Sequence, residues 1–307
     1  MAVFAQKMHT LTTIFSLLLM ASLPTALLDA HYYDKTCPQA ENIILGTVYN
    51  ASMHDPKVPA RILRMFFHDL LLDSTPGNQA EKDGPPNISV RSFYMIDDAK
   101  TKLEMACPHT VSCADIITFA ARDVVTMSRG PHWNVLALLE CAEGRKDGRI
   151  SKAAETINLP APTFNVTQLI QSFAKRGIGA KDLVALSGSH TLGFSHCSSF
   201  EARLHNFSSA HDTDPSMNSE FAQKLRKKCP KPNRDHNAGE FLDSTLSTFD
   251  NDYYRRLMPG MGVFGSDQAL AGDYRTRWIE FTASMVKLGN VGVIENGEVR
   301  LKCRVVN

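Results

Sequence analysis

Apolar residues recur at helical spacing along most of the chain. The clearest case is Cys113–Met127, where apolar residues at i, i+4, i+7 and i+8 form one helical face: Ile117, Ala121, Val124 and Val125. Two further segments are amphipathic, residues 167–176 and 220–228. Strand-like alternation is scarce, and the best short candidate is 298–304. The pattern therefore predicts a mostly α fold, with loops at its proline- and glycine-rich breaks: 76–86, 158–163 and 230–240.

The segment DLVALSGSHTLG, residues 182–193, places a histidine on an apolar helical face. Asp182 is expected to cap the helix, because its carboxylate accepts from free backbone N–H groups. Leu183, Leu186 and His190 then fall at i, i+3 and i+7 on one face. A lone histidine in such a place is more often a packed core residue than a ligand. The alternative is a metal or haem ligand.

A second segment, PARILRMFFHD at 59–69, brings an arginine and a histidine together. Arg64, Phe67 and His68 lie at i, i+3 and i+4, so they share one face of a helix. The ordinary interpretation is an arginine that reaches the surface and a histidine that only packs. The same set suits peroxide chemistry. The histidine would move the peroxide proton, and the arginine would stabilise the charge that develops as the O–O bond breaks.

Taken with both segments, the order of motifs resembles that of the secreted class III haem peroxidases of plants. The matching strings are YYDKTCP (32–38), RMFFHD (64–69), VSCADI (111–116), AARDVV (120–125), GRKDG (144–148), LPAP (159–162), DLVALSGSHT (182–191), FDNDYY (249–254) and SDQAL (266–270). The resemblance covers residues 32–307. It implies a two-lobed helical domain over 31–307, with haem b between a distal lobe ending near residue 150 and a proximal lobe after it.

The resemblance assigns roles to the two histidines. His190 is implied as the axial haem-iron ligand, with Asp267 accepting from its other ring nitrogen. Taken alone, Asp267 would more simply be a helix or turn cap. His68 is implied as the acid–base group and Arg64 as the group that stabilises the transition state.

Further residues near the haem follow from the same motifs. Asn87 is implied to orient His68, Phe67 to contact the haem, and Pro160 to line the substrate entrance. Glu81 would support the Asn87 loop. Simple loop rigidity is the alternative for Pro160.

Calcium is also implied, with a departure. A proximal site is expected from oxygen ligands close to His190: Thr191, Asp243, Thr245, Thr248 and Asp250. Such clusters are by themselves usually turns. After Asp69 the chain runs directly into Leu70, so about ten residues of the family pattern are absent, including most distal calcium ligands. Asp69 alone cannot form a cage, and we expect no distal calcium site.

Two other junctions depart from the family pattern. Residues 137–143, ALLECAE, are inserted before GRKDG and carry an extra cysteine, Cys141. After Trp278-Ile279-Glu280 the chain passes abruptly into FTASMVKLGN, where the family has a further helical stretch. This loss should thin the proximal core.

The N-terminus predicts export. Lys7, an apolar run over 11–23 and small residues before His31 are typical of a cleaved secretory leader, residues 1–30 with an approximate cleavage site. We therefore expect a secreted protein of the cell wall, apoplast or vacuole. The net charge of +1 favours neither nucleic acid nor an anionic membrane as a partner. We expect a monomer that meets hydrogen peroxide and small phenols.

Seven cysteines in a secreted chain imply disulfides with one cysteine left over. Spacing does not give the pairing, but the resemblance implies Cys37–Cys107, Cys113–Cys303 and Cys197–Cys229, leaving Cys141 unpaired. Sequons stand at Asn50, Asn165 and Asn206, where a surface glycan is expected, and at Asn87, where burial would exclude one.

The function expected from these motifs is one-electron oxidation of phenolic donors by hydrogen peroxide, as in cell-wall (lignin-type) coupling and peroxide removal. The alternative is a haem-poor, inactive relative or a secreted glycoprotein without turnover, because segments of the scaffold are missing. A zinc hydrolase using the eleven histidines is disfavoured, since no zinc-binding spacing is present.

Overall fold

The computed structural model describes residues 31–131, 144–232, 235–276 and 281–307. Three features of the sequence lie outside these residues: the leader, the inserted stretch with Cys141 and the junction at 278–280. None of the helices in the described part of the chain is long and apolar enough to cross a membrane.

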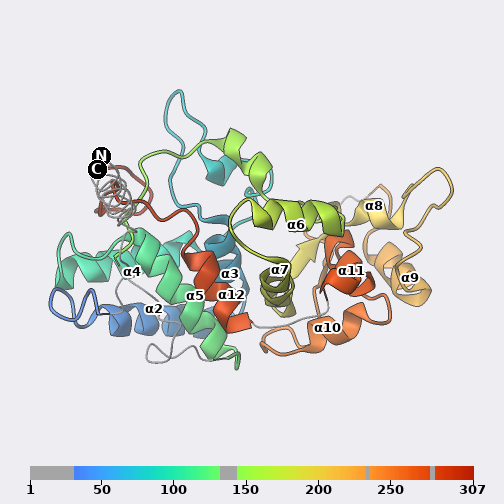
Figure 1. Cartoon of the computed structure of the whole chain (residues 1–307), viewed down its shortest axis with the longest axis horizontal. Helices are drawn as coiled ribbons and strands as arrows, with labels where there is room; N and C mark the ends of the chain where they lie inside the picture. The colour runs from blue at the N-terminus through green and yellow to red at the C-terminus, as the bar shows by residue number, and fades with distance from the viewer. Residues whose placement is uncertain (1–30, 132–143, 233–234, 277–280) are drawn as a thin grey trace, which may run out of the picture.

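Four helices form the distal lobe at one end of the molecule (Figure 1): α2 (Ala40–His54), α3 (Val58–His68), α4 (Phe93–Ala106) and α5 (Cys113–Met127). The predicted helix at 113–127 is confirmed with the same bounds as α5. Its N-cap Ser112 accepts the Asp115 N–H at 3.1 Å. Helix α5 packs on the other three helices, and twelve of its fifteen residues are therefore buried.

The proximal lobe contains shorter helices. Two of the predicted amphipathic segments are confirmed with small shifts, as α6 (Val166–Ala174) and α9 (Ser219–Lys228). The other helices are α7 (Ala180–Ser187), α8 (Glu201–Leu204), α10 (Asp252–Leu257), α11 (Gly265–Gly272) and α12 (Phe281–Gly289). Short 3₁₀ turns connect them: η1 (Glu81–Asp83), η2 (Ala153–Asn158), η3 (Gly188–Thr191), η4 (Cys197–Ser199) and η5 (Tyr274–Thr276).

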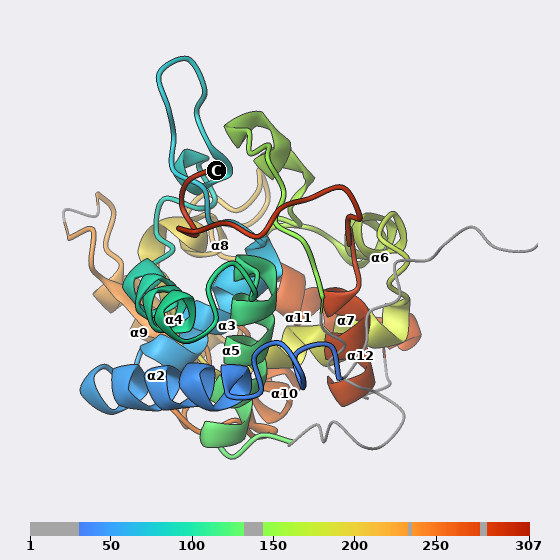
Figure 2. The ribbon, with the colours of Figure 1, turned by 90° about the vertical axis from the view of Figure 1, so that its left-hand side faces the viewer.

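Helices of the two lobes meet in the middle of the molecule. Figure 1 shows α6 and α7 between the distal helices and the α8–α11 group, and α12 packs against α7. The larger hydrophobic cluster includes Ile117 and Phe119 from before residue 150 and Phe173, Leu183 and Leu186 from after it. Figure 2, seen from the distal end, shows α2, α4 and α5 in front of this shared core.

The predicted strand at 298–304 is wrong. The structure has a single antiparallel pair in its described part, β1 (Phe194–His196) with β2 (Gly239–Phe241). The C-terminal segment makes only isolated bridges, one of them between Asp147 and Glu298. The Asp147 carboxylate also accepts the Arg300 N–H at 2.9 Å. The Asp147 side chain therefore occupies the position where a neighbouring strand would have to bind for a β-ladder to continue along this segment.

The three expected disulfides are present, with Cα–Cα distances of 5.5–5.6 Å. Cys37–Cys107 connects the start of α2 to the end of α4. Cys113–Cys303 connects the start of α5 to the C-terminal segment across 190 residues. Cys197–Cys229 closes the loop that contains α8 and α9.

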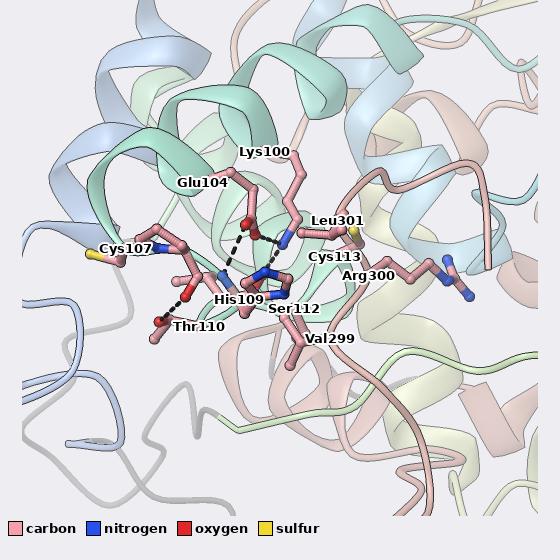
Figure 3. A network of polar contacts seen from close by, with 12 residues as sticks. Lys100, Glu104, Cys107, His109, Thr110, Ser112, Cys113, Val299, Arg300 and Leu301 are labelled. Carbon is pink, nitrogen blue, oxygen red and sulfur yellow. Dashed lines mark hydrogen bonds and ion pairs between the residues drawn. The ribbon is translucent and has the colours of Figure 1, made fainter. Parts of the chain in front are cut away.

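A buried ion pair lies beside the second disulfide. Lys100 of α4 is 2% exposed, pairs with Glu104 at 2.6 Å and donates to the Val111 carbonyl at 2.7 Å. Glu104 accepts the His109 N–H at 2.9 Å. Figure 3 shows Lys100 and Glu104 pointing toward the loop that leads to Cys113. This network therefore holds the turn between α4 and α5.

Candidate active site

Helix α3 presents the distal residues, as predicted from their spacing. It ends at Asp69, which has a left-handed backbone with φ 48°. His68 Nδ1 lies 2.5 Å from Asn87 Oδ1, and Asn87 Nδ2 donates to the Glu81 carbonyl at 2.7 Å. Because Asn87 uses its amide N–H on Glu81, its oxygen must accept from His68. The His68 proton therefore resides on Nδ1, and Nε2 is left as a free proton acceptor.

The surroundings of His68 keep its ring neutral. Burial, and then the positive charge of Arg64, lower the His68 pKa to about 4, against a small opposing effect of the Asn87 hydrogen bond. Asn87 is 2% exposed, so its sequon is buried as expected, whereas Asn50, Asn165 and Asn206 are exposed.

Arg64 brings a positive charge that no acidic side chain in the described part of the chain neutralises. Its guanidinium donates to Ser89 Oγ at 2.9 Å and to the Pro86 carbonyl at 2.7 Å, both neutral acceptors. It forms no ion pair with any described residue. Sequence analysis missed Pro86 and Ser89, because a carbonyl and a small hydroxyl in a loop carry no distinctive pattern.

On the proximal side, His190 and Asp267 come together. His190 Nδ1 lies 3.0 Å from Asp267 Oδ2 and 3.1 Å from Oδ1. Asp267 lies in α11 and is 3% exposed. The ring therefore donates from Nδ1 and leaves Nε2 free. Desolvation lowers the His190 pKa, but the Asp267 charge and hydrogen bond outweigh it, so the pKa is raised.

The helical setting predicted for His190 is partly wrong. Helix α7 ends at Ser187, and His190 lies in the tighter 3₁₀ turn η3. Asp182 does cap α7 as expected, from inside the first turn: its carboxylate accepts the N–H of the N-cap residue Gly179 at 3.1 Å. The same carboxylate accepts from Ser284 and Lys287 of α12. The capping carboxylate thus also fastens α12 to α7.

A cavity connects the distal residues with the expected entrance. Its volume is about 450 Å³, and its lining includes Phe67, His68, Asn87, Pro160, Phe173 and Ile178. The positive charge of Arg64 opposes the rise of the His190 pKa and is the smallest of the effects on that ring. The side chain of His190 is 39% exposed, compared with 5% for Asp267.

This donor set fits a haem. A neutral imidazole nitrogen fixed from behind by a carboxylate is the usual axial arrangement for haem iron. Phe264 and Tyr253 pack edge-on against the His190 ring, with ring centroids 5.3 and 6.0 Å away. These aromatic neighbours were also missed by sequence analysis, because their motifs gave them no separate role.

The predicted proximal calcium ligands lie together. Thr191 Oγ1 is 2.5 Å from Asp243 Oδ2 and 3.5 Å from Asp250 Oδ1. Thr245 Oγ1 lies 3.2 Å from Asp243 Oδ1 and 3.4 Å from the Thr248 carbonyl. The cluster offers carboxylate, hydroxyl and carbonyl oxygens, which suits Ca²⁺. Burial raises the Asp243 pKa, with Thr191 and Thr245 opposing.

The surroundings of Asp69 are different. The charged groups that act on it are Arg300, Asp147 and Arg145, and burial raises its pKa. No group of three or more His, Cys, Asp or Glu residues that could hold a metal occurs among the described residues, at Asp69 or in the proximal cluster, whose other oxygens come from threonines. Glu81, near Asp69, instead accepts the Ser151 hydroxyl at 2.9 Å, a partner that sequence analysis missed.

Comparisons with known proteins agree with this geometry. A family model described as Peroxidase matches residues 44–283. Peroxidase 66 of Arabidopsis thaliana is 64% identical over 317 residues, covering 96% of this chain and 97% of the relative. Peroxidase 64 of the same plant is 47% identical (97% and 99%), and Peroxidase 1 of Oryza sativa subsp. japonica is 39% identical (92% and 94%).

The extent of these matches leaves no large region of the chain unexplained. The 317 aligned positions exceed the 307 residues of this chain, so the relative has residues for which this chain has no counterpart. The family model spans both α3 and α11, which carry the distal histidine and the proximal aspartate. This chain therefore belongs to the peroxidase family and is a plant class III haem peroxidase.

Proposed function

We propose that this haem peroxidase uses His68, Arg64 and Asn87 on the distal side and His190 with Asp267 on the proximal side to oxidise small phenols. The observation that carries the assignment is the difference between the two histidines. His68 is held by a neutral amide and has a lowered pKa, whereas His190 is held by a carboxylate and has a raised pKa. One ring suits proton transfer, and the other suits electron donation to a metal.

Bound haem would supply an iron centre that reacts with hydrogen peroxide and accepts electrons from donors. His190 would hold the iron through Nε2. Its Nδ1–H would donate to the Asp267 carboxylate, which makes the ring a stronger electron donor to the iron. Phe67, next to His68 on α3, would contact the haem.

The distal residues move the peroxide proton. His68 Nε2 takes the proton of the first peroxide oxygen and returns it to the leaving oxygen. Asn87 keeps the other ring nitrogen protonated, so the accepting nitrogen always faces the cavity. Arg64 stabilises the negative charge that develops as the oxygens separate, because its own charge has only neutral partners.

Phenolic donors would enter beside Pro160, which lines the same cavity as His68. Two successive one-electron oxidations would release two phenoxyl radicals, as in cell-wall coupling. The protein would act as a monomer in the cell wall, apoplast or vacuole.

The proposal includes one calcium ion per chain. Thr191, Asp243 and Asp250 with Thr245 and Thr248 would hold it next to His190. Asp69 would be a remnant of the distal site, and Glu81, held by the Ser151 hydroxyl, would support the Asn87 loop.

A visible absorption spectrum of the purified, secreted protein tests the proposal. We expect a haem band that shifts on addition of one equivalent of hydrogen peroxide and recovers when a phenol is added. His68→Ala should slow the shift by about 10²–10⁴-fold, because the proton acceptor is lost. His211→Ala, at an exposed position, is the control. A protein without a haem band after refolding with hemin and Ca²⁺ would instead be a haem-poor relative.

A further inference from the structure

A buried tyrosine lies behind the proximal histidine and has no assigned role. Tyr253, near the start of α10, is 2% exposed. Its ring centroid is 6.0 Å from that of His190, and the two planes are nearly perpendicular at 71°. Its hydroxyl is enclosed and has no hydrogen-bond partner of good geometry among the residues that the structure describes. A buried phenol without a partner costs free energy, so the packing must offset that cost.

Two polar side chains lie close enough to this hydroxyl to share a hydrogen with it among the described residues, the Asp267 carboxylate and the Ser187 hydroxyl, and the Tyr254 phenol also acts on it. Asp267 is the same carboxylate that accepts from His190. The Tyr253 phenol therefore lies beside a proton acceptor, the Asp267 carboxylate. Its ring also contacts His190, the residue proposed to bind the haem iron.

A second tyrosine provides a comparison within the same helix. The Tyr254 ring centroid is 4.9 Å from that of Tyr253. Its hydroxyl donates to the Val184 carbonyl at 2.9 Å, and the position of Gly188 leaves room for it, since a Cβ there would collide with the hydroxyl. A carbonyl oxygen cannot take up a proton near neutral pH. Tyr254 is thus similarly located, but its hydroxyl donates to a carbonyl oxygen that cannot accept its proton.

We propose that Tyr253 is a redox-active side chain that reduces the peroxide-oxidised haem by one electron when no phenolic donor is bound. The electron passes through His190, the O–H bond of Tyr253 breaks, and its proton moves to the Asp267 carboxylate. The products are a neutral tyrosyl radical and a haem that has gained one electron. The inference rests on the proposed haem ligation by His190, and peroxide is the oxidant.

Freeze-quench electron paramagnetic resonance on the haem-loaded protein tests this inference. One equivalent of hydrogen peroxide is added without donor, and the tyrosyl signal is recorded for the parent, Tyr253→Phe and Tyr254→Phe. We expect a rapidly relaxing tyrosyl signal in the parent and in Tyr254→Phe, since the radical lies near the iron. In Tyr253→Phe this signal should fall to background, and the haem band should return to its resting form more slowly.

The Tyr253→Phe variant should fold, because it removes a hydroxyl that has no well-formed hydrogen bond and keeps the ring. The resting haem band of each variant checks this directly. An unchanged signal in Tyr253→Phe, or a signal only from exposed tyrosines such as Tyr49 and Tyr94, would overturn the inference while leaving the peroxidase assignment intact. A parent protein whose haem band does not respond to peroxide would overturn both.

Discussion

Two histidines in this protein are made different by the residue that holds each at Nδ1. Asn87 accepts from His68 without adding charge, and the nearby Arg64 opposes a second proton. Asp267 adds a full negative charge beside His190. On the proposed assignment, the neutral His68 ring is the proton acceptor and the His190 ring is the electron-rich ligand.

The pH dependence of the peroxide reaction follows from His68. Below its pKa the ring is protonated and cannot accept the peroxide proton, and above it the ring is neutral. We therefore expect the rate of the haem-band shift to stay constant between neutral pH and about one unit above the His68 pKa. At lower pH the rate should fall, with a midpoint near pH 4. Stopped-flow absorption at a series of pH values measures this. A midpoint near the ordinary histidine value of about 6.5 would contradict it.

Replacing the proximal carboxylate should weaken haem binding. Asp267→Asn removes the charge that raises the His190 pKa and makes the ring a poorer donor. Loss of such a partner typically costs about 10–100-fold in metal affinity or activity. Hemin titration followed by absorption gives the affinity. Asp98→Asn, which alters an exposed carboxylate paired with Lys102, is the matched control and should leave hemin affinity unchanged.

At the scale of elements, each helix positions a few functional side chains. Helix α3 places Arg64, Phe67 and His68 on one face and then ends in the left-handed Asp69. Helix α7 gives way to η3 just before His190, which tightens the backbone there. The Lys100–Glu104 pair fixes the turn from α4 into α5, against which α3 packs.

Breaking that buried pair should destabilise the protein. Lys100→Met leaves Glu104 and the Val111 carbonyl without a buried cation, and we expect a loss of about 2–4 kcal/mol in the free energy of unfolding. Lys102→Met on the same helix breaks an ion pair whose side chains are 39% and 53% exposed, so its cost should stay below about 1 kcal/mol. Urea unfolding of both variants provides the comparison. Equal losses would show that burial of Lys100 does not matter.

At the scale of the whole molecule, the two lobes share one core and enclose the site between them. The Cys113–Cys303 disulfide returns the C-terminal segment to the distal lobe, and the Asp182–Lys287 pair fastens α12 to α7. The proximal oxygen cluster connects η3 with the segment before α10. These long-range links hold His190 in position relative to α3.

Calcium should therefore stabilise the haem-binding lobe. We expect metal analysis to find one Ca²⁺ per chain, and its removal by a chelator should lower both the melting temperature and haem retention. At a calcium concentration a hundred times the Kd, a single site contributes about 2.7 kcal/mol. Asp243→Asn should reproduce the loss, because it removes a carboxylate ligand. Two tightly bound ions in the parent would contradict the loss of the distal site.

The sequence by itself determined the family, the helical class and the identity of the principal candidate residues. The spacing of Arg64, Phe67 and His68 within one helix is local information, and α5 was predicted with its observed bounds. Both depend on periodicity over a few turns, which the order of residues records directly.

Only the tertiary structure decided how those residues act. The partners of Arg64, the neutral hold on His68, the 3₁₀ turn at His190 and the position of Tyr253 all depend on contacts between distant segments. The apparent strand at 298–304 failed for the same reason, because a strand needs a neighbouring strand and this segment pairs with one residue, Asp147, through a single backbone bridge and its carboxylate. The local sequence pattern determines on which face of a helix a side chain lies. The packing of the two lobes determines which residues that helix face contacts.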